Sequence, residues 1–228
     1  LDYVKANYED QDLIIIKNDS KKSQEQYNRI LADLQALNPE KEVKILEPKD
    51  GYIHPDEFRV FRDTLERNIV NWFFITDNEP AYLGDVFNNL GVFPEADSLI
   101  VFGFEKDRNF SKIDNNFLAR VHFHYPINTF IDYNALSYKN FEAIYRRKYF
   151  AWPSAYAVEG FDLTFDLLQR LASNSDMISQ GVSERVGTRY DFIENTSGGI
   201  INKGMYIVKY DGLEEKVLNT KKPLDSDL

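Results

Sequence analysis

Four short apolar runs, each joined to the next by helix-like sequence, constrain the fold of this 228-residue chain most strongly. They are residues 13–16, 43–46, 69–76 and 99–104. The first, LIII, is apolar at every position, which is typical of a strand buried on both faces. Alternation of such strands with helices predicts a parallel sheet with right-handed crossovers and helices on both faces. The expected fold class is therefore α/β, a doubly wound parallel sheet in an αβα sandwich.

The segments between these runs have the period and the end signals of amphipathic helices. Apolar residues from Ser23 to Leu37 fall on one stripe, and Asn38-Pro39 ends that pattern. His54-Pro55-Asp56 opens a second helix, with Pro near its first turn. Residues 77–80 precede a third helix, for which Gly91 is the expected C′ residue.

After residue 120 the regular alternation stops and aromatic residues become frequent. Two short strands are expected, at Val121–His124 and Ile131–Tyr133, and then two helices at about 138–149 and 155–172. The rest is predicted to contain a small helix and loop, antiparallel strands and a solvated tail, at 175–187, 190–192, 200–201, 205–210 and 214–228.

Composition excludes several classes of function. A net charge of −10 repels phosphate backbones, which argues against nucleic acid as a partner. The absence of cysteine excludes disulfides, thiolate nucleophiles and cysteine metal sites. No GxGxxG, GxxxxGK[ST] or GxSxG motif occurs, so no cofactor is expected and a catalytic role is disfavoured. An α/β enzyme is kept as a weaker alternative, which would need a convergent acid–base set.

His122 and His124 are the only histidine pair close in sequence. On a strand they would point to the same face and could supply two metal ligands. Because spacing places no third ligand near them, we expect no metal site and assign these histidines to a polar or hinge-lining role.

Polar residues follow the predicted strands at the edge where parallel sheets bind ligands, beyond the carboxyl ends. Asn18, Asp77 and Glu105 are the candidates there. Helix capping is the competing interpretation for Asp77 and Glu79. Glu105 has no helix to cap, which favours a role in binding.

A family resemblance rests on the phrases HYP, FIDY, FEAIYRRKYFAWPSAYAVEGFD and GGIINKGMYIVKY. Together they resemble the type I periplasmic binding proteins of the branched-chain amino-acid (leucine-binding) class. The likeness is greatest to the divergent Bacteroidetes versions that are often attached to a LysM peptidoglycan-binding module. The family has a recurring sequence pattern, which this chain matches at Phe141, Tyr145, Tyr149, Pro153, Tyr156, Ala157, Gly160, Phe161 and Asp162.

The resemblance implies two αβα lobes joined by three crossings, with the ligand between the lobes. Residues 1–120 would be the second-lobe α/β domain and 121–134 the hinge crossing. Residues 135–187 would be helices returning to the first lobe, and 188–228 the final crossing, strands and tail. The first lobe would then be incomplete here, and we expect a piece of a longer gene product. The aromatic faces of the helices in 135–169 should be poorly covered.

The resemblance also implies which residues bind. Gly103-Phe104-Glu105 resembles the Gly-x-Glu sequence of leucine-binding relatives, in which the carboxylate binds the amino group of the ligand. Tyr125 and Tyr133 flank the proposed crossing and are candidates for lining the cleft. The positions near Ser20 and Asp77 are not aromatic as they are in relatives, which weakens the case for an amino-acid ligand.

The function expected is a non-catalytic, exported solute-binding-like protein of the periplasm or cell envelope. Its ligand would be an amino acid or a cell-wall-derived molecule. A membrane permease and, through a module outside this chain, peptidoglycan are the partners implied, and a homo-oligomer is left open. The alternative is a cell-envelope interaction or scaffolding module that keeps the fold without a ligand.

Overall fold

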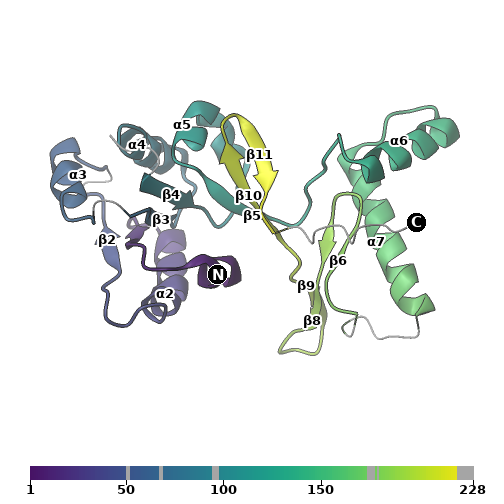
Figure 1. Ribbon diagram of the computed structural model, residues 1–228, viewed down its shortest axis with the longest axis horizontal. Coiled ribbons are helices and arrows are strands. Elements are labelled where there is room, and N and C mark those ends of the chain that lie inside the picture. The colour runs from purple at the N-terminus through teal and green to yellow at the C-terminus, as the bar shows by residue number, and fades with distance from the viewer. Residues whose placement is uncertain (50–51, 67–68, 94–97, 174–177, 179, 220–228) are drawn as a thin grey trace. The chain divides into compact units, whose positions relative to one another are not determined.

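The structure, a computed structural model, describes residues 1–49, 52–66, 69–93, 98–173, 178 and 180–219 (Figure 1). The chain divides into two compact units. Unit 1 is Leu1–Pro126 together with Ile207–Leu218, and unit 2 is Ile127–Tyr206 together with the residues from Asn219 on. The chain thus changes unit after residues 126, 206 and 218. The lobe and hinge roles expected for 1–120, 121–134, 135–187 and 188–228 stay predictions.

A seven-stranded sheet in the order β11-β10-β5-β4-β3-β1-β2 forms the centre of unit 1. The pairs from β2 to β5 are parallel, and β10 with β11 is antiparallel. The predicted α/β class with a mostly parallel sheet is confirmed. The strands are β1 (Leu13–Ile16), β2 (Lys44–Leu46), β3 (Asn71–Ile75), β4 (Leu99–Phe102), β5 (His124–Ile127), β10 (Tyr206–Asp211) and β11 (Glu214–Val217).

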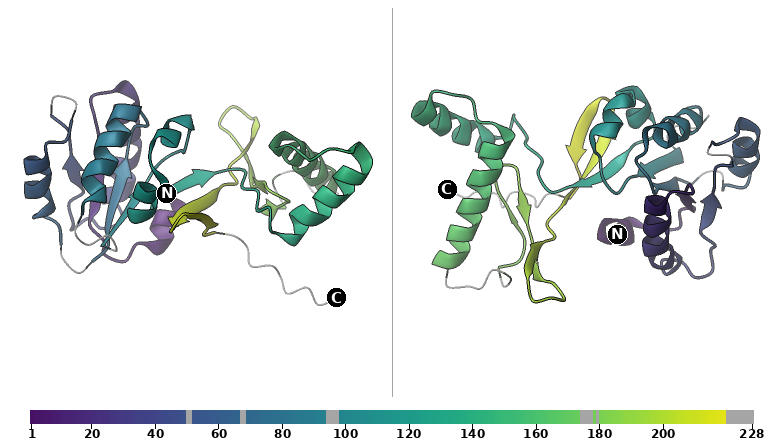
Figure 2. Two further views of the ribbon diagram at one scale, coloured as in Figure 1. Left: turned by 90° about the horizontal axis from the view of Figure 1, so that it is seen from above. Right: turned by 180° about the vertical axis from the view of Figure 1, so that it is seen from behind.

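Helices cover both faces of this sheet (Figure 2). They are α1 (Asp2–Asn7), α2 (Lys21–Gln35), α3 (Pro55–Arg62), α4 (Pro80–Gly91) and α5 (Asn115–Arg120), with a 3-10 turn, η2, at Arg108–Lys112. On one face Ile15, Trp72 and Phe74 pack with Ile30 and Leu34 of α2. Every residue of β1 and β3 is buried, as both-face burial in a parallel sheet requires.

Gly91 does not have the predicted role of a left-handed C′ residue. It is the last residue of α4, and the cap is Val92 with φ −96°. A Cβ at Gly91 would lie 2.6 Å from Cδ1 of Phe117 on α5. The glycine is therefore needed for close packing of two helices rather than for its backbone freedom.

The predicted strand at Val121–His124 is wrong in its position. Residues 121–123 close the end of α5, because Val121 N donates to Phe117 O and Phe123 N donates to Leu118 O. His122 has φ 47°, a left-handed conformation that a strand excludes. The strand β5 begins only at His124, so the two histidines do not share a strand face. No strand forms at Ile131–Tyr133 either.

The described residues of unit 2 form two helices and two small antiparallel ribbons. The helices are α6 (Leu136–Tyr149) and α7 (Ala155–Ala172), both close to the predicted bounds, and the ribbons are β6–β7 and β8–β9. The strands are β6 (Ser183–Glu184), β7 (Arg189–Tyr190), β8 (Phe192–Glu194) and β9 (Ile200–Asn202). A strand at 183–184 corrects part of the predicted helix and loop; residues 174–177 and 179 lie outside the described residues.

The predicted solvated tail also needs a correction. Residues 214–217 form β11, paired with β10 from Val208↔Val217 to Asp211↔Glu214. Sequence reasoning missed this strand because three of its four residues are charged, whereas strands are usually rich in β-branched and aromatic residues. Residues 220–228 lie outside the described residues.

Buried carboxylates fasten α7 to the ribbons of unit 2. Asp162 accepts hydrogen bonds from the backbone N–H groups of residues 186, 187 and 188, at 2.8 to 3.0 Å. One turn later, Asp166 pairs with Arg170 Nε at 2.6 Å and with Arg185 at 2.6 Å. Because Asp166 and Arg170 are fully buried, removing either partner would leave an uncompensated charge.

The opposite side of α7 is apolar and exposed, in line with the expectation that these helices are poorly covered. Its exposed large apolar side chains are Tyr156, Phe161, Leu163, Phe165, Leu168 and Leu171. An apolar surface of this size usually marks an interaction surface.

His124 should make the stability of unit 1 depend on pH. Burial lowers the pKa of its imidazole to about 4, and positive charge on Lys209 and His122 adds to the effect. Between pH 6.5 and 4 the unfolded chain therefore binds a proton that the folded chain does not. We expect the free energy of unfolding to fall by up to about 3 kcal/mol as pH drops through this window. Urea denaturation at several pH values measures it.

The control is His124→Phe, which keeps a ring between Tyr3 and Phe102 but cannot take a proton. Carboxylates that titrate near pH 4 contribute equally to both proteins, so the difference between the two curves isolates His124. An equal pH dependence in the variant would contradict this assignment.

Candidate functional site

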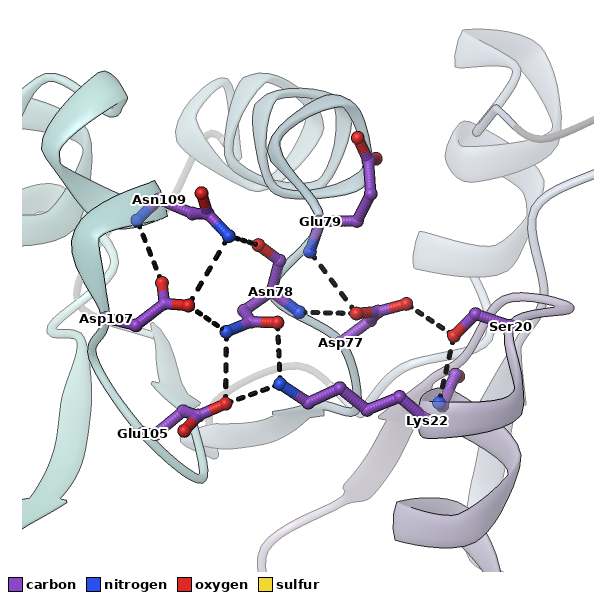
Figure 3. A network of polar contacts seen from close by, with 9 residues as sticks. Ser20, Lys22, Asp77, Asn78, Glu79, Glu105, Asp107 and Asn109 are labelled. Carbon is purple, nitrogen blue, oxygen red and sulfur yellow. Dashed lines mark hydrogen bonds and ion pairs between the residues drawn. The ribbon is translucent and has the colours of Figure 1, made fainter.

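A cluster of polar side chains lies at the carboxyl ends of β1, β3 and β4 (Figure 3). The segment after β1 contributes Ser20 and Lys22; the segment after β3 contributes Asp77, Asn78 and Glu79; and the segment after β4 contributes Glu105, Asp107 and Asn109. Asn18, also from the segment after β1, joins them through its hydrogen bond to Asp77. These segments meet because β1, β3 and β4 are parallel neighbours, so their chains all leave the sheet at one edge. We call these nine residues the edge cluster.

Asp77 is the internal anchor of the edge cluster. Its Oδ2 accepts from Asn18 Nδ2 at 3.0 Å and from the Ser20 hydroxyl at 2.5 Å. Its Oδ1 accepts from the backbone N–H groups of Asn78 at 2.7 Å and Glu79 at 3.3 Å. Burial opposes ionisation, but these donors together hold the pKa of Asp77 below its usual value. Both oxygens are thus already used by the protein.

The capping interpretation describes Glu79 correctly. Glu79 is the N-cap of α4, and its Oε2 accepts from Tyr82 N at 2.9 Å. Ser20 has the same role for α2, where its hydroxyl accepts from Ser23 N at 3.0 Å. Two helix starts are therefore fixed beside Asp77, which ties one start to the other.

Glu105 lies in the more open half of the cluster. Lys22 Nζ forms an ion pair with its carboxylate and donates to Asn78 Oδ1 at 2.6 Å. Asn78 Nδ2 donates to Glu105 Oε1 at 3.0 Å and also to Asp107. The Glu105 side chain is 53% exposed and that of Lys22 43%. The cation and its partners can therefore exchange with water or with a ligand more easily than Asp77 can.

The space left beside this half of the cluster is small. A cavity of about 10 Å³ is lined by residues of the three segments and by Gln26, Ile75 and Phe104. It holds about one water molecule. Binding of anything larger would require Lys22 or Glu105 to move.

The other two predicted site residues, Tyr125 and Tyr133, are not among the residues of the edge cluster. Tyr125 is buried on β5, where Lys106 Nζ lies 5.2 Å from its ring centroid. Lys106 also donates to Tyr210 Oη at 2.6 Å and pairs with Glu215. Burial and the negative charge of Glu215 raise the pKa of Tyr125 far above its usual value. Tyr133 belongs to unit 2, where its ring packs on Tyr138 at 4.9 Å.

Sequence reasoning placed Asn18, Asp77 and Glu105 at this edge, where the structure has them, but it did not single out Lys22, Asp107 or Asn109. Lys22 lies in the run KNDSKKS, which reads only as a helix start. The missed signal is the recurrence of Asp and Asn after each parallel strand. No group of three or more metal-ligating side chains occurs among the residues that the structure describes.

Structure comparisons support the fold of a type I periplasmic binding protein. An ABC transporter substrate-binding protein from Desulfitobacterium hafniense, in complex with Leu, aligns with a TM-score of 0.51 at 14% identity. A branched-chain amino acid ABC transporter protein from Rhodospirillum rubrum gives 0.54 at 11%. An amino acid ABC transporter substrate-binding protein from Pseudomonas fluorescens Pf-5 gives 0.51 at 8%.

These alignments cover 95% of this chain but only 61–62% of the solved chains. The chain thus has the type I periplasmic-binding-protein fold over less than two thirds of those proteins' length. No protein-family model matches the sequence, and no curated protein matches it. Within the described residues, no helix is long and apolar enough to cross a membrane.

Asp77→Asn should destabilise unit 1. In the variant an amide nitrogen, which cannot accept a hydrogen bond, replaces one carboxylate oxygen. Either the side-chain donors or the backbone donors of Asp77 therefore lose their acceptor. We expect the free energy of unfolding to fall by about 1–3 kcal/mol, as measured by urea denaturation.

Asp56→Asn is the matched control for Asp77→Asn. Its side chain is 91% exposed at the start of α3, and a change of less than about 0.5 kcal/mol is expected. Equal effects at positions 77 and 56 would show that Asp77 does not anchor the cluster.

Proposed function

We propose that this chain belongs to an exported, non-catalytic solute-binding protein and contributes one wall of its ligand site. The ligand would be a small polar molecule, either an amino acid or a cell-wall-derived piece. The observation that carries the proposal is the edge cluster, where Lys22, Asn78 and Glu105 lie half-exposed at the carboxyl edge of a parallel sheet. Open α/β sheets bind their ligands at that edge.

The charges of the edge cluster suit a ligand with an ammonium group. Glu105 and Asn78 Oδ1 are acceptors that share one cation, the Nζ of Lys22. A ligand ammonium could replace Nζ there and form the same charge-assisted hydrogen bonds, while Lys22 swings into solvent. Asp77 would keep its structural partners and act on the ligand only through Asn78. Direct contacts from Asn18, Tyr125 or Tyr133 stay predictions.

The remaining wall of the site would come from a first lobe. We propose that residues 1–120 form the second lobe, that 121–134 act as a hinge, and that 135–187 return to the first lobe. The coverage of 61–62% of the solved neighbours supports an incomplete first lobe. The sheet of that lobe would cover the exposed apolar side of α7. A periplasmic or cell-envelope location and a permease partner follow from the same proposal, and a LysM module would supply any contact with peptidoglycan.

One observation favours a second candidate, a cell-envelope scaffolding module without a ligand. The groups of the edge cluster satisfy one another, and the cavity beside Glu105 has room for about one water molecule. A protein that never binds a solute would be expected to close its site in this way.

Isothermal titration of the full-length protein against amino acids and muropeptides separates the two candidates. We expect saturable heat with at least one of these ligands, and binding about tenfold or more weaker in Glu105→Gln because a charge-assisted hydrogen bond is lost. Absence of heat with every ligand would favour the scaffolding module.

Glu57→Gln is the control for this titration. Glu57 is also a half-exposed carboxylate paired with a lysine, Lys49 at 2.7 Å, but it lies on α3. Its replacement should leave affinity unchanged. If Glu57→Gln and Glu105→Gln weakened binding equally, the ligand would not be bound at the edge cluster.

A further inference from the structure

The turn between α6 and α7 forms a second candidate binding surface, which lies wholly within unit 2. A hollow of about 460 Å³ is lined there by Ala143, Arg146, Arg147, Phe150, Ala151 and Trp152. We call these six residues the α6–α7 corner. Its volume falls in the range of sites that take a small molecule or an inserted side chain, whereas the cavity at the edge cluster does not.

The α6–α7 corner is locally basic in a chain whose net charge is −10. Arg146 pairs with Glu142 at 3.2 Å, and its guanidinium lies 3.8 Å from the Trp152 ring centroid. Arg147 is exposed and forms no ion pair with any residue in the described part of the chain. Lys148 lies beside it, over the ring of Tyr149. The guanidinium group of Arg147 can therefore donate two parallel hydrogen bonds to the two oxygens of one carboxylate.

Phe150 adds a large apolar side chain to the corner, and its backbone adopts an unfavourable left-handed conformation. It follows α6 with φ 53° and ψ 29°, a left-handed position that glycine usually occupies at a helix end. Its side chain is nevertheless 93% exposed, so no packing inside the chain offsets that conformation. Trp152, which also lines the hollow, is 66% exposed. Aromatic and arginine side chains are the ones that dominate binding energy at protein interfaces.

We propose that the α6–α7 corner binds an acidic segment of a partner protein that carries one large apolar side chain. The carboxylates of the segment would pair with Arg147 and with the outer edge of Arg146. The apolar side chain would enter the hollow between Phe150 and Trp152. This interaction is independent of the ligand proposed at the edge cluster, because the two sites share no residue and lie in different units.

An anionic membrane also attracts basic and aromatic residues, but the charges of this chain favour a peptide. A flat membrane surface also meets the acidic residues around the corner, such as Glu142 beside Arg146, within the Debye length of about 8 Å at physiological ionic strength. A peptide segment meets only the corner.

Tryptophan fluorescence can report on this binding directly. The chain has two tryptophans, and Trp72 is only 4% exposed in the core of unit 1, whereas Trp152 lines the hollow. The probe is a blocked five-residue peptide with Phe between two pairs of Glu. We expect a saturable blue shift of the Trp152 emission that weakens with added salt. The same peptide with Lys for Glu, or with Ala for Phe, should bind about tenfold or more weakly.

Two variants distinguish binding from a structural role. Arg147→Glu reverses a charge that has no ion pair in the described residues, and it should abolish the shift without changing the melting temperature. Phe150→Gly relieves the left-handed position, so it should raise the melting temperature by about 2–4 °C while weakening peptide binding about tenfold. Lys139→Glu, on the same helix but outside the hollow, is the matched charge control and should bind as the wild type does.

The proposal is overturned if no acidic peptide produces a saturable shift, or if Lys139→Glu loses binding as fully as Arg147→Glu. It is also overturned in favour of a membrane if vesicles with 30% phosphatidylserine produce a larger shift than the peptide. A failure here leaves the ligand proposal untouched, because Glu105→Gln and Phe150→Gly change different units and different measurements.

Discussion

Burial of the parallel ladder β1–β3–β4 on both faces is the constraint on which the rest of unit 1 depends. Residues 13–16 and 71–75 have no exposed face, so helices must cover both sides of the sheet and the chain must cross over between strands. Each crossover begins at the same sheet edge. Polar residues that the core cannot accept therefore collect there, and the edge cluster follows from the packing of the strands.

The edge cluster contains two carboxylates, Asp77 and Glu105, that differ in how firmly the protein holds them. Asp77 uses both oxygens on four donors and connects the starts of α2 and α4. Glu105, one strand further, is held mainly by a half-exposed lysine. The two carboxylates thus differ in their surroundings, because Asp77 has two backbone donors within reach and Glu105 accepts from the side chains of Lys22 and Asn78. The buried carboxylate fixes the starts of the two helices, while the carboxylate of Glu105 and its lysine partner are both half-exposed to solvent.

In unit 2, one side of α7 is held by buried charged groups and the other side is exposed to solvent. Asp162, Asp166 and Arg170 attach one side of α7 to the ribbons through buried charges. The other side exposes large apolar residues, and the α6–α7 corner adds an exposed aromatic residue in a left-handed position. Stability is thereby concentrated on one side of the helix pair, which leaves the other side available for contacts with further protein.

Local chemistry was enough to predict much of this protein. The apolar runs predicted the parallel sheet, and helical periodicity predicted α7 at about 155–172, where the structure has it. The sequence by itself determined these features because each depends on residues close together in the chain. The end of α5 at residues 121–123 and the β10–β11 hairpin are also local, but the apolar pattern does not mark them. Tertiary structure decided the place of β5 beside β4 and the partnership of Lys22 with Glu105. These depend on groups from distant segments, which meet only once the parallel strands have brought them to one edge of the sheet.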